Sequence, residues 1–345
     1  MRVRWWERTI ADSSWERSPG IGLSDVTLSG SSEQRWQVPL PRIAIVGDRN
    51  SGKTTFLGLL YTTQVKSGSD KADDFRFHAA FESLDEISGV FQRLMSGSFP
   101  DSATKEGIRE ITFRLGYRRP GRGIFSRQRS QAWASDSSVA FQLIVLKTFE
   151  DDMARQRNGG SIADATLRDA IGSDAMVIMV DSGKLVVVDD DSAPRPLGKY
   201  DAAVESVLTA VQRSRGQAER AVLHPIFVFS KFDQVDANTL RRANLDSTPP
   251  AARKKGPREA FAKALLDPNL PKTMAKVRAR ERRGLEFATP SYFFSWVRTD
   301  ETASSRSEKV RLRRSGPVGW EPDYSSDEYV AFLECIWDIG SHVKV

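Results

Sequence analysis

Residues 43–60 read IAIVGDRNSGKTTFLGLL, and this stretch decides the fold. A short β-branched run ends at Gly47, a polar loop with glycines follows, and apolar residues then recur at helical spacing. The loop fits the pattern G-x-x-x-x-G-K-[ST] and is spelled Gly47-Asp48-Arg49-Asn50-Ser51-Gly52-Lys53-Thr54. Because this pattern lies between a predicted strand and a predicted helix, we predict a phosphate-binding loop here.

The residue types of this loop explain how it would hold phosphate. Glycines let successive backbone N–H groups converge on an anion, and the following helix contributes the positive end of its dipole. We expect Lys53 to neutralise the outer phosphates and the Thr54 hydroxyl to bind Mg²⁺. Thr55 either donates to the inner phosphate or simply lies in the first helical turn. The nucleotide-binding residues predicted from the loop are Gly47, Asn50, Ser51, Gly52, Lys53, Thr54 and Thr55.

Strand and helix patterns alternate along the rest of the chain. Strands are predicted near 108–115, 138–146, 175–181, 221–230 and 285–294. Helices are predicted near 81–94, 162–171, 200–213, 258–283 and 329–340, and Pro268 and Pro271 are expected to interrupt the one at 258–283. The first two of these strands are expected to form a β-hairpin, and 175–181 is apolar enough to lie in mid-sheet. Ser83 and Glu86 have the spacing of a helix capping box. We therefore predict an α/β P-loop NTPase fold: a mostly parallel sheet with one antiparallel hairpin strand, helices on both faces and several insertions.

The predicted domain organisation is simple. Residues 1–41 contain four tryptophans and no sustained period, so we interpret them as an N-terminal extension. The P-loop domain would then cover 42–345. Polar or proline-rich stretches predict insertions, the last of them a loop, near 66–107, 118–137, 236–283 and 297–325.

Composition excludes several classes of protein. The 345 residues are 39% hydrophobic and 28% charged, which is near the average of folded proteins and excludes disorder as the main feature. No apolar run approaches the roughly 18 residues of a membrane-spanning helix, and the opening MRVRWWERTI lacks the apolar stretch of a signal peptide. We therefore expect a cytoplasmic protein with no transmembrane segment. A single cysteine, Cys335, excludes an internal disulfide, and the three histidines lack zinc-ligand spacing, so any metal would be held by oxygen.

Two later segments concern the base of a nucleotide. Ser230-Lys231-Phe232-Asp233 follows a buried strand and resembles the N/T-K-x-D motif of P-loop GTPases, with Ser in the first place. In that family the Asp carboxylate accepts both N1–H and N2–H of guanine, which adenine cannot offer, and the Lys stem packs over the ring. Ser295 stands where GTPases offer a backbone N–H to guanine O6, and Trp296 replaces the usual small residue. The resemblance thus implies that Lys231, Asp233, Ser295 and Trp296 bind guanine.

The order of these motifs over about residues 42–340 resembles the translation-factor and Ras-like superclass of GTPases. Within it, Gly97-Ser98-Phe99-Pro100-Asp101-Ser102-Ala103-Thr104 looks like the G-x-[WF]-P-x-x-T stretch of bacterial double-GTPase-like proteins. That likeness implies that Thr104 is the switch I threonine, which senses Mg²⁺ and the γ phosphate. A polar loop threonine without that role is the alternative, and Ser102 competes for the position.

The sequence departs from the family at the D-x-x-G segment, whose Asp binds Mg²⁺ through water. The second hairpin strand runs instead into Lys147-Thr148-Phe149-Glu150. A cation in the Asp place would repel Mg²⁺, so Glu150 or Asp151 becomes the candidate for a displaced carboxylate. Asp181, which ends another strand, is either a structural residue or the Walker B acid of an ATP-using P-loop protein. The candidate catalytic residues are thus Thr104, Glu150 and Asp151.

These residues favour a guanine-nucleotide-binding switch protein with slow or partner-dependent hydrolysis of GTP to GDP, using GTP/GDP and Mg²⁺. The alternatives are a non-hydrolysing GTPase-like scaffold and an ATP-binding protein that uses Asp181. Lys and Arg exceed Asp and Glu by six, and several arginines fall in the hairpin loop around Arg118, Arg119 and Arg122. We expect this loop to contact an acidic protein partner beside the switch regions. Nucleic acid is disfavoured as a partner because no regular series of aromatic platforms accompanies the charge.

Overall fold

The computed structural model describes part of the chain, all of it within one compact unit that spans residues 39–345. The described residues are 42–65, 75–79, 83–101, 110–117, 137–145, 172–187, 195–215, 222–279, 285–300, 309–315 and 319–343. The N-terminal extension, the helix predicted at 162–171 and the Arg-rich hairpin loop lie outside them.

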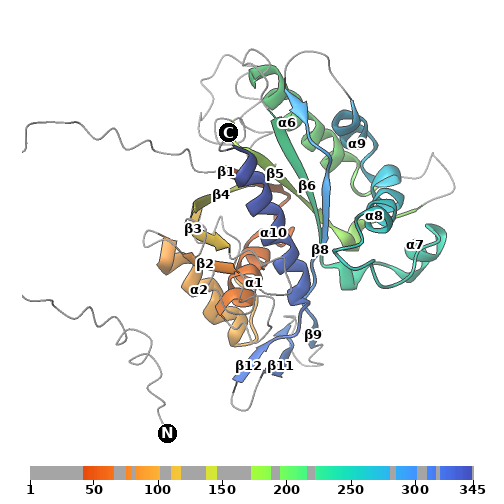
Figure 1. Ribbon diagram of the computed structural model, residues 1–345. Helices are drawn as coiled ribbons and strands as arrows, with labels where there is room; N and C mark the ends of the chain where they lie inside the picture. Colours follow the sequence, from red (N-terminus) through yellow and green to blue (C-terminus); the bar gives the residue numbers. More distant parts are fainter. Residues whose placement is uncertain are drawn as a thin grey trace, which may run out of the picture. The chain divides into compact units, whose positions relative to one another are not determined.

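The described residues form an eight-stranded central sheet (Figure 1). Its strands are β1 (Arg42–Gly47), β2 (Phe75–Ala79), β3 (Glu110–Tyr117), β4 (Ser137–Val145), β5 (Ala175–Asp181), β6 (Val222–Ser230), β7 (Glu286–Phe287) and β8 (Ser291–Phe294). The order across the sheet is β2-β3-β4-β1-β5-β6, and both β7 and β8 pair with β6. Only β3 among these strands runs against the others, since its pairings with β2 and β4 are antiparallel and the remaining pairings are parallel. The predicted parallel sheet with one reversed strand is confirmed.

Helices cover both faces of this sheet (Figure 1). They are α1 (Lys53–Val65), α2 (Leu84–Met95), α6 (Gly198–Arg215), α7 (Ala237–Arg242), α8 (Lys255–Asn269), α9 (Pro271–Arg278) and α10 (Ser326–Val343). Successive residues of a strand point to opposite faces. Thus Ile43 and Ile45 of β1 join one core with α1, α2 and α10, whereas Ala44 and Val46 join another with α6, α8 and α9.

These features define an α/β P-loop NTPase fold. Strand β1 is central, its residues 43–46 are fully buried, and it leads through the glycine-containing loop directly into α1. Strand β5, predicted for mid-sheet from its apolar run, indeed lies between β1 and β6. The continuous apolar character of β1, β5 and β6 follows from burial on both faces, which parallel sheets require.

The structure corrects two local predictions. The Ser83 hydroxyl does not cap α2; it accepts the backbone N–H of Thr112 at 3.0 Å and so ties the helix start to β3. Residues 297–325, predicted as loop, contain two small antiparallel sheets: β9 (Thr299–Asp300) with β10 (Lys309–Val310), and β11 (Leu312–Ser315) with β12 (Gly319–Pro322). Strands of two to four residues are too short to show a period in the sequence.

Prolines and an insertion explain further differences. The strand predicted at 285–294 is split into β7 and β8, with Pro290 between them, where a ladder N–H would be missing. The helical stretch predicted at 258–283, with interruptions at Pro268 and Pro271, breaks at Pro271 alone, because α9 begins there at a position that tolerates the missing N–H. Pro268 is accommodated in the last turn of α8. The insertion predicted near 66–107 contributes β2 to the sheet edge.

Arg258 holds three parts of the fold together. Its side chain is 4% exposed and donates to the carbonyls of Tyr292 and Pro250, each at 2.7 Å, and to the Glu328 carboxylate of α10. The guanidinium also lies over the Phe294 ring, 4.7 Å from its centroid. The buried cation thus connects α8, β8 and α10.

We predict that Arg258→Ala lowers the free energy of unfolding by about 3–5 kcal/mol, because it leaves the largely buried Glu328 carboxylate without its cation. Urea denaturation measures the loss. Lys263→Ala on the same helix breaks the exposed pair with Glu259 and should cost at most about 1 kcal/mol. Equal losses in the two variants would contradict the role assigned to Arg258.

Candidate functional site

The loop between β1 and α1 is a tight curl. Asn50 and Gly52 both have left-handed backbones, with φ of 63° and 82°. Glycine adopts this region freely and asparagine tolerates it better than most residues. The Ser51 N–H donates to the Asp48 carbonyl at 3.2 Å, and the Phe56 N–H donates to the Gly52 carbonyl at 2.8 Å. The sequence therefore supplies permissive residues where the chain reverses into α1.

Two glycines of the loop face close neighbours. A Cβ on Gly47 would lie 2.4 Å from Ser51 Oγ and 2.9 Å from Met179 Cβ, closer than real Cβ contacts. A Cβ on Gly52 would lie 3.5 Å from Ser230 Cβ, so the loop packs against the end of β6. The curl is thus fitted between β5 and β6 as well as closed upon itself.

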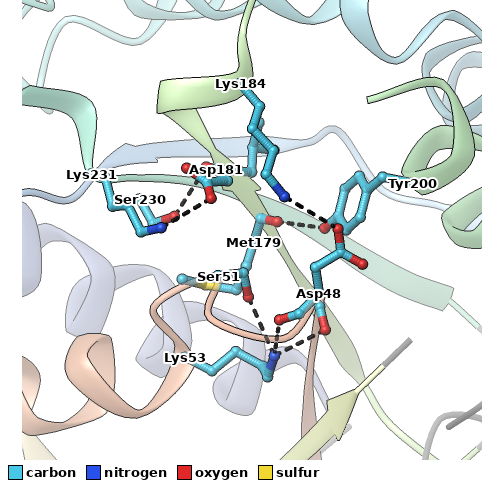
Figure 2. Close-up of polar contacts among 11 residues, drawn as sticks. Asp48, Ser51, Lys53, Met179, Asp181, Lys184, Tyr200, Ser230 and Lys231 are labelled. Atoms are coloured by element: carbon cyan, nitrogen blue, oxygen red, sulfur yellow. Dashed lines mark hydrogen bonds and ion pairs between the residues drawn. The ribbon is translucent and has the colours of Figure 1, made fainter. Parts of the chain in front are cut away.

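The ammonium of Lys53 lies inside this curl (Figure 2). Lys53 Nζ donates to the Gly47 carbonyl at 2.9 Å, the Asp48 carbonyl at 2.6 Å and Ser51 Oγ at 3.3 Å. Burial lowers the pKa of Lys53 to about 8, while the negative charge of Asp48 acts in the opposite direction. These three acceptors are neutral oxygens, so an anion at the loop would stabilise the charged form of Lys53.

A cavity of about 270 Å³ opens over the loop. Its lining comes from the loop and the first turn of α1, from the turn after β6, from the segment after β8 and from the segment after α2. Such a position, at the carboxyl ends of parallel strands, is where α/β folds bind ligands. The residues predicted to bind nucleotide that line the cavity are Asn50, Ser51, Gly52, Lys53, Thr54, Thr55, Lys231, Asp233, Ser295 and Trp296.

The other predicted residues are placed differently. Gly47 ends β1 and is buried outside the lining. The candidates Thr104, Glu150 and Asp151 lie outside the described residues, as does Lys147. The cavity also has lining residues that no motif indicated, among them Gln234, Val297 and Thr299.

Lys231 and Asp181 form an ion pair at the ends of β6 and β5. Lys231 adopts a left-handed backbone with φ of 52°, and its Nζ lies 3.0 Å from Asp181 Oδ2 (Figure 2). Ser230 Oγ donates to the Val180 carbonyl at 3.1 Å and fixes the same pair of strand ends. Asp181 is thus engaged by a lysine and does not line the cavity. This arrangement disfavours Asp181 as a metal-binding acid and favours its structural alternative.

Ser295 connects the two segments that were predicted to read a base. Its N–H donates to the Phe229 carbonyl at 2.7 Å and its carbonyl accepts the Phe232 N–H at 3.1 Å. The expectation that the Ser295 N–H faces a ligand is therefore wrong, because the neighbouring strand already uses it. Within the described ranges the backbone N–H of Trp296 has no hydrogen-bond partner. The backbone donor available to a ligand is therefore that of Trp296, one residue after Ser295.

The cavity wall at 97–101 is fastened to the small β10 strand. Gly97 has a left-handed φ of 79°, and its carbonyl accepts the Val310 N–H at 2.9 Å. Further along the segment, Asp101 pairs with Arg93 of α2 at 2.6 Å. The glycine was visible in the sequence, but its partner, more than 200 positions away, was not.

No model of a known family and no curated protein matches this sequence. Among solved structures, the chain is similar to the S. cerevisiae Ski7 GTPase-like domain bound to GDP and inorganic phosphate, with 14% identity and a TM-score of 0.31. The match covers 74% of this chain and 43% of the Ski7 chain, which is less than half of its length. No helix within the described ranges is long and apolar enough to cross a membrane.

We predict that Gly47→Ala lowers the free energy of unfolding by about 1–3 kcal/mol, because the new methyl group forces Ser51 or the neighbouring strand to shift. Chemical denaturation checks this. Gly89→Ala in α2 is the control. No atom lies within 4 Å of the position that the alanine Cβ would take, and alanine should stabilise the helix by about 0.5–1 kcal/mol. A neutral Gly47→Ala would show that the loop is not tightly fitted there.

Proposed function

We propose that this chain is a guanine-nucleotide-binding protein related to P-loop GTPases, which holds GDP or GTP in the cavity over the β1–α1 loop. The observation that carries the proposal is the meeting of three segments around one cavity: the glycine–lysine loop, the Lys231–Asp233 turn and the segment that begins at Ser295. Each is distant from the others in the sequence; the loop has the chemistry that phosphates need, and the other two segments have the chemistry that a base needs.

The phosphates would lie on the loop. Lys53 would exchange its neutral oxygen acceptors for charged phosphate oxygens, so that its positive charge is paired with a negative one. The N-terminus of α1 would add its dipole to the same charge. To meet an anion at the loop, the Lys53 side chain would have to turn away from the loop oxygens that it now contacts.

The base would lie between the other two segments. Asp233 lines the cavity and would accept the two N–H groups of guanine, while the Lys231 stem would pack on the ring. The Trp296 N–H, rather than that of Ser295, would donate to guanine O6. Adenine offers neither that acceptor nor that pair of donors, so the segments would prefer guanine.

The residues present suit a Mg²⁺ ion that takes most of its ligands from phosphate and water. Thr54 lines the cavity, and the described residues contain no group of three or more His, Cys, Asp or Glu side chains that could hold a metal alone. Mg²⁺ in nucleotide sites commonly keeps several waters and only one or two protein ligands. When bound, it would neutralise charge on the transferring phosphoryl group. Thr54 is the proposed protein ligand, with Thr104 as a second candidate.

Hydrolysis is proposed to be slow or dependent on a partner, as in a molecular switch. The reason is the sequence Lys147-Thr148-Phe149-Glu150 in the D-x-x-G place, where a cation replaces the metal-facing Asp. Glu150 and Asp151 are the proposed substitutes for that carboxylate. A protein that keeps the nucleotide as a structural ligand would bind GTP and never turn it over, so phosphate release separates the two cases.

Competition binding tests the proposal directly. A fluorescent GDP analogue bound to the protein should be displaced by GDP at much lower concentration than by ADP, since a site built for a polar pair rejects its isostere strongly. Equal displacement by ADP and GDP would overturn the assignment of the base. No binding of either would overturn the site.

We predict that Lys53→Ala removes most affinity for GDP while the protein stays folded, because the ammonium supplies the main positive charge at the phosphates. Asp233→Asn should instead reduce the preference for GDP over ADP, because the amide accepts one hydrogen bond where the carboxylate accepts two. Isothermal titration calorimetry with both nucleotides measures the two effects. Unchanged GDP affinity in folded Lys53→Ala would contradict the phosphate assignment.

We also predict that nucleotide binding takes up protons near pH 8. Lys53 has a pKa of about 8 in the free protein, and phosphates would raise it, so GDP affinity should fall as the pH rises above 8. Near this pH the lysine would gain a fraction of a proton on binding, measured by calorimetry in buffers of different ionisation enthalpy. Lys53→Arg, which stays charged, is the control that should lack this uptake. Equal uptake by both proteins would contradict the prediction.

A further inference from the structure

The start of α10 is hydrogen-bonded to the last residue of β8 and to the residue that follows it. The Phe294 N–H donates to Glu328 Oε2 at 3.0 Å, and Ser295 Oγ lies 2.7 Å from the Tyr329 hydroxyl oxygen. Further along, Val297 forms a β-bridge with Tyr324. One short C-terminal stretch therefore sets the path of the chain from the end of β8 past Trp296.

Tyr329 is a buried residue of this C-terminal stretch. The residue is 1% exposed, and its ring packs 5.3 Å from Phe56 of α1 and 5.5 Å from Tyr324, measured between ring centroids. Burial raises the pKa of the Tyr329 hydroxyl, which stays protonated. A buried hydroxyl needs a hydrogen-bond partner, and Ser295 Oγ provides it.

Ser295 passes this constraint to both predicted base-reading segments. Its N–H is bonded to the end of β6 at Phe229, and its carbonyl holds the Phe232 N–H in the middle of the Lys231–Asp233 turn. The next residue along the chain is Trp296, whose N–H points to no partner among the described residues. A change at the Ser295 side chain would thus shift both the Lys231–Asp233 turn and the backbone N–H of Trp296.

We propose that Tyr329 is a positioning residue for base selection: its hydroxyl fixes Ser295, and Ser295 aligns the Asp233 turn with the Trp296 N–H. This inference rests on the proposed guanine site. Tyr329 does not line the cavity, so it acts through Ser295 and not by touching the nucleotide. The phosphate loop is positioned by β1 and α1, so it does not depend on the hydrogen bond between Ser295 and Tyr329.

The test compares two tyrosines that each lose a buried hydroxyl. Tyr329→Phe should weaken GDP binding by roughly three- to tenfold, the range expected for one lost hydrogen bond, and leave ADP and inorganic tripolyphosphate binding unchanged. Tyr324→Phe is the matched control: its hydroxyl lies 3.0 Å from Thr63 Oγ1 on α1, away from the β8 segment. The control should keep the GDP-to-ADP affinity ratio of the parent protein.

The possible outcomes are distinct. A parent protein that does not prefer GDP overturns the proposed function and this inference with it. A selective parent protein whose affinity ratio is unchanged in Tyr329→Phe overturns the inference alone, as does an equal loss for GDP, ADP and tripolyphosphate or an equal fall in the control. If Tyr329→Phe fails to fold, Ser295→Ala removes the same hydrogen bond from the other side and is judged by the same ratio. In a double variant the two losses should not add, because they remove one bond.

Discussion

The structure depends on a short turn that reverses the chain between two buried elements and encloses the Lys53 ammonium. Strand β1 and helix α1 are both packed in the core, so the loop that joins them must reverse within a few residues and still satisfy the charge of Lys53. The left-handed Asn50 and Gly52 make that reversal possible, and the loop carbonyls supply the acceptors. A buried cation on neutral oxygens is tolerated at a cost, which is why its pKa falls and why an anion would be welcome there.

The parallel sheet gives this loop its neighbours. Because β1, β5, β6 and β8 run in the same direction, their carboxyl ends meet at one edge, and the segments that follow β1, β6 and β8 line one cavity. The far side of the cavity is fixed from the C-terminal part of the chain, through α10 and through the bond between Val310 and Gly97. A partner that moved the small sheets at 299–322 would therefore act on the cavity wall as well.

Local patterns explain which parts of this arrangement could be predicted. The β1–loop–α1 unit is contiguous, and its glycines and lysine indicate the curl. Most residues of β5 and β6 are buried, so their apolar runs could be recognised as strands. Hydrogen bonds between distant residues could not be predicted in this way. The Ser83 hydroxyl accepts the backbone N–H of Thr112, and the Ser295 N–H donates to the Phe229 carbonyl. The two-stranded sheets within 297–325 were missed for the same reason, since their stability comes from cross-strand partners and not from a period of their own.

Hydrogen exchange of backbone amides with and without GDP tests the central claim that three separate segments form one nucleotide site. If they do, GDP slows exchange together in residues 47–55, 230–235 and 294–297, and inorganic phosphate slows it only in 47–55. Protection by GDP that stays confined to 47–55 would contradict a single nucleotide site, because the base would then make no contact with the turn after β6 or with the segment after β8.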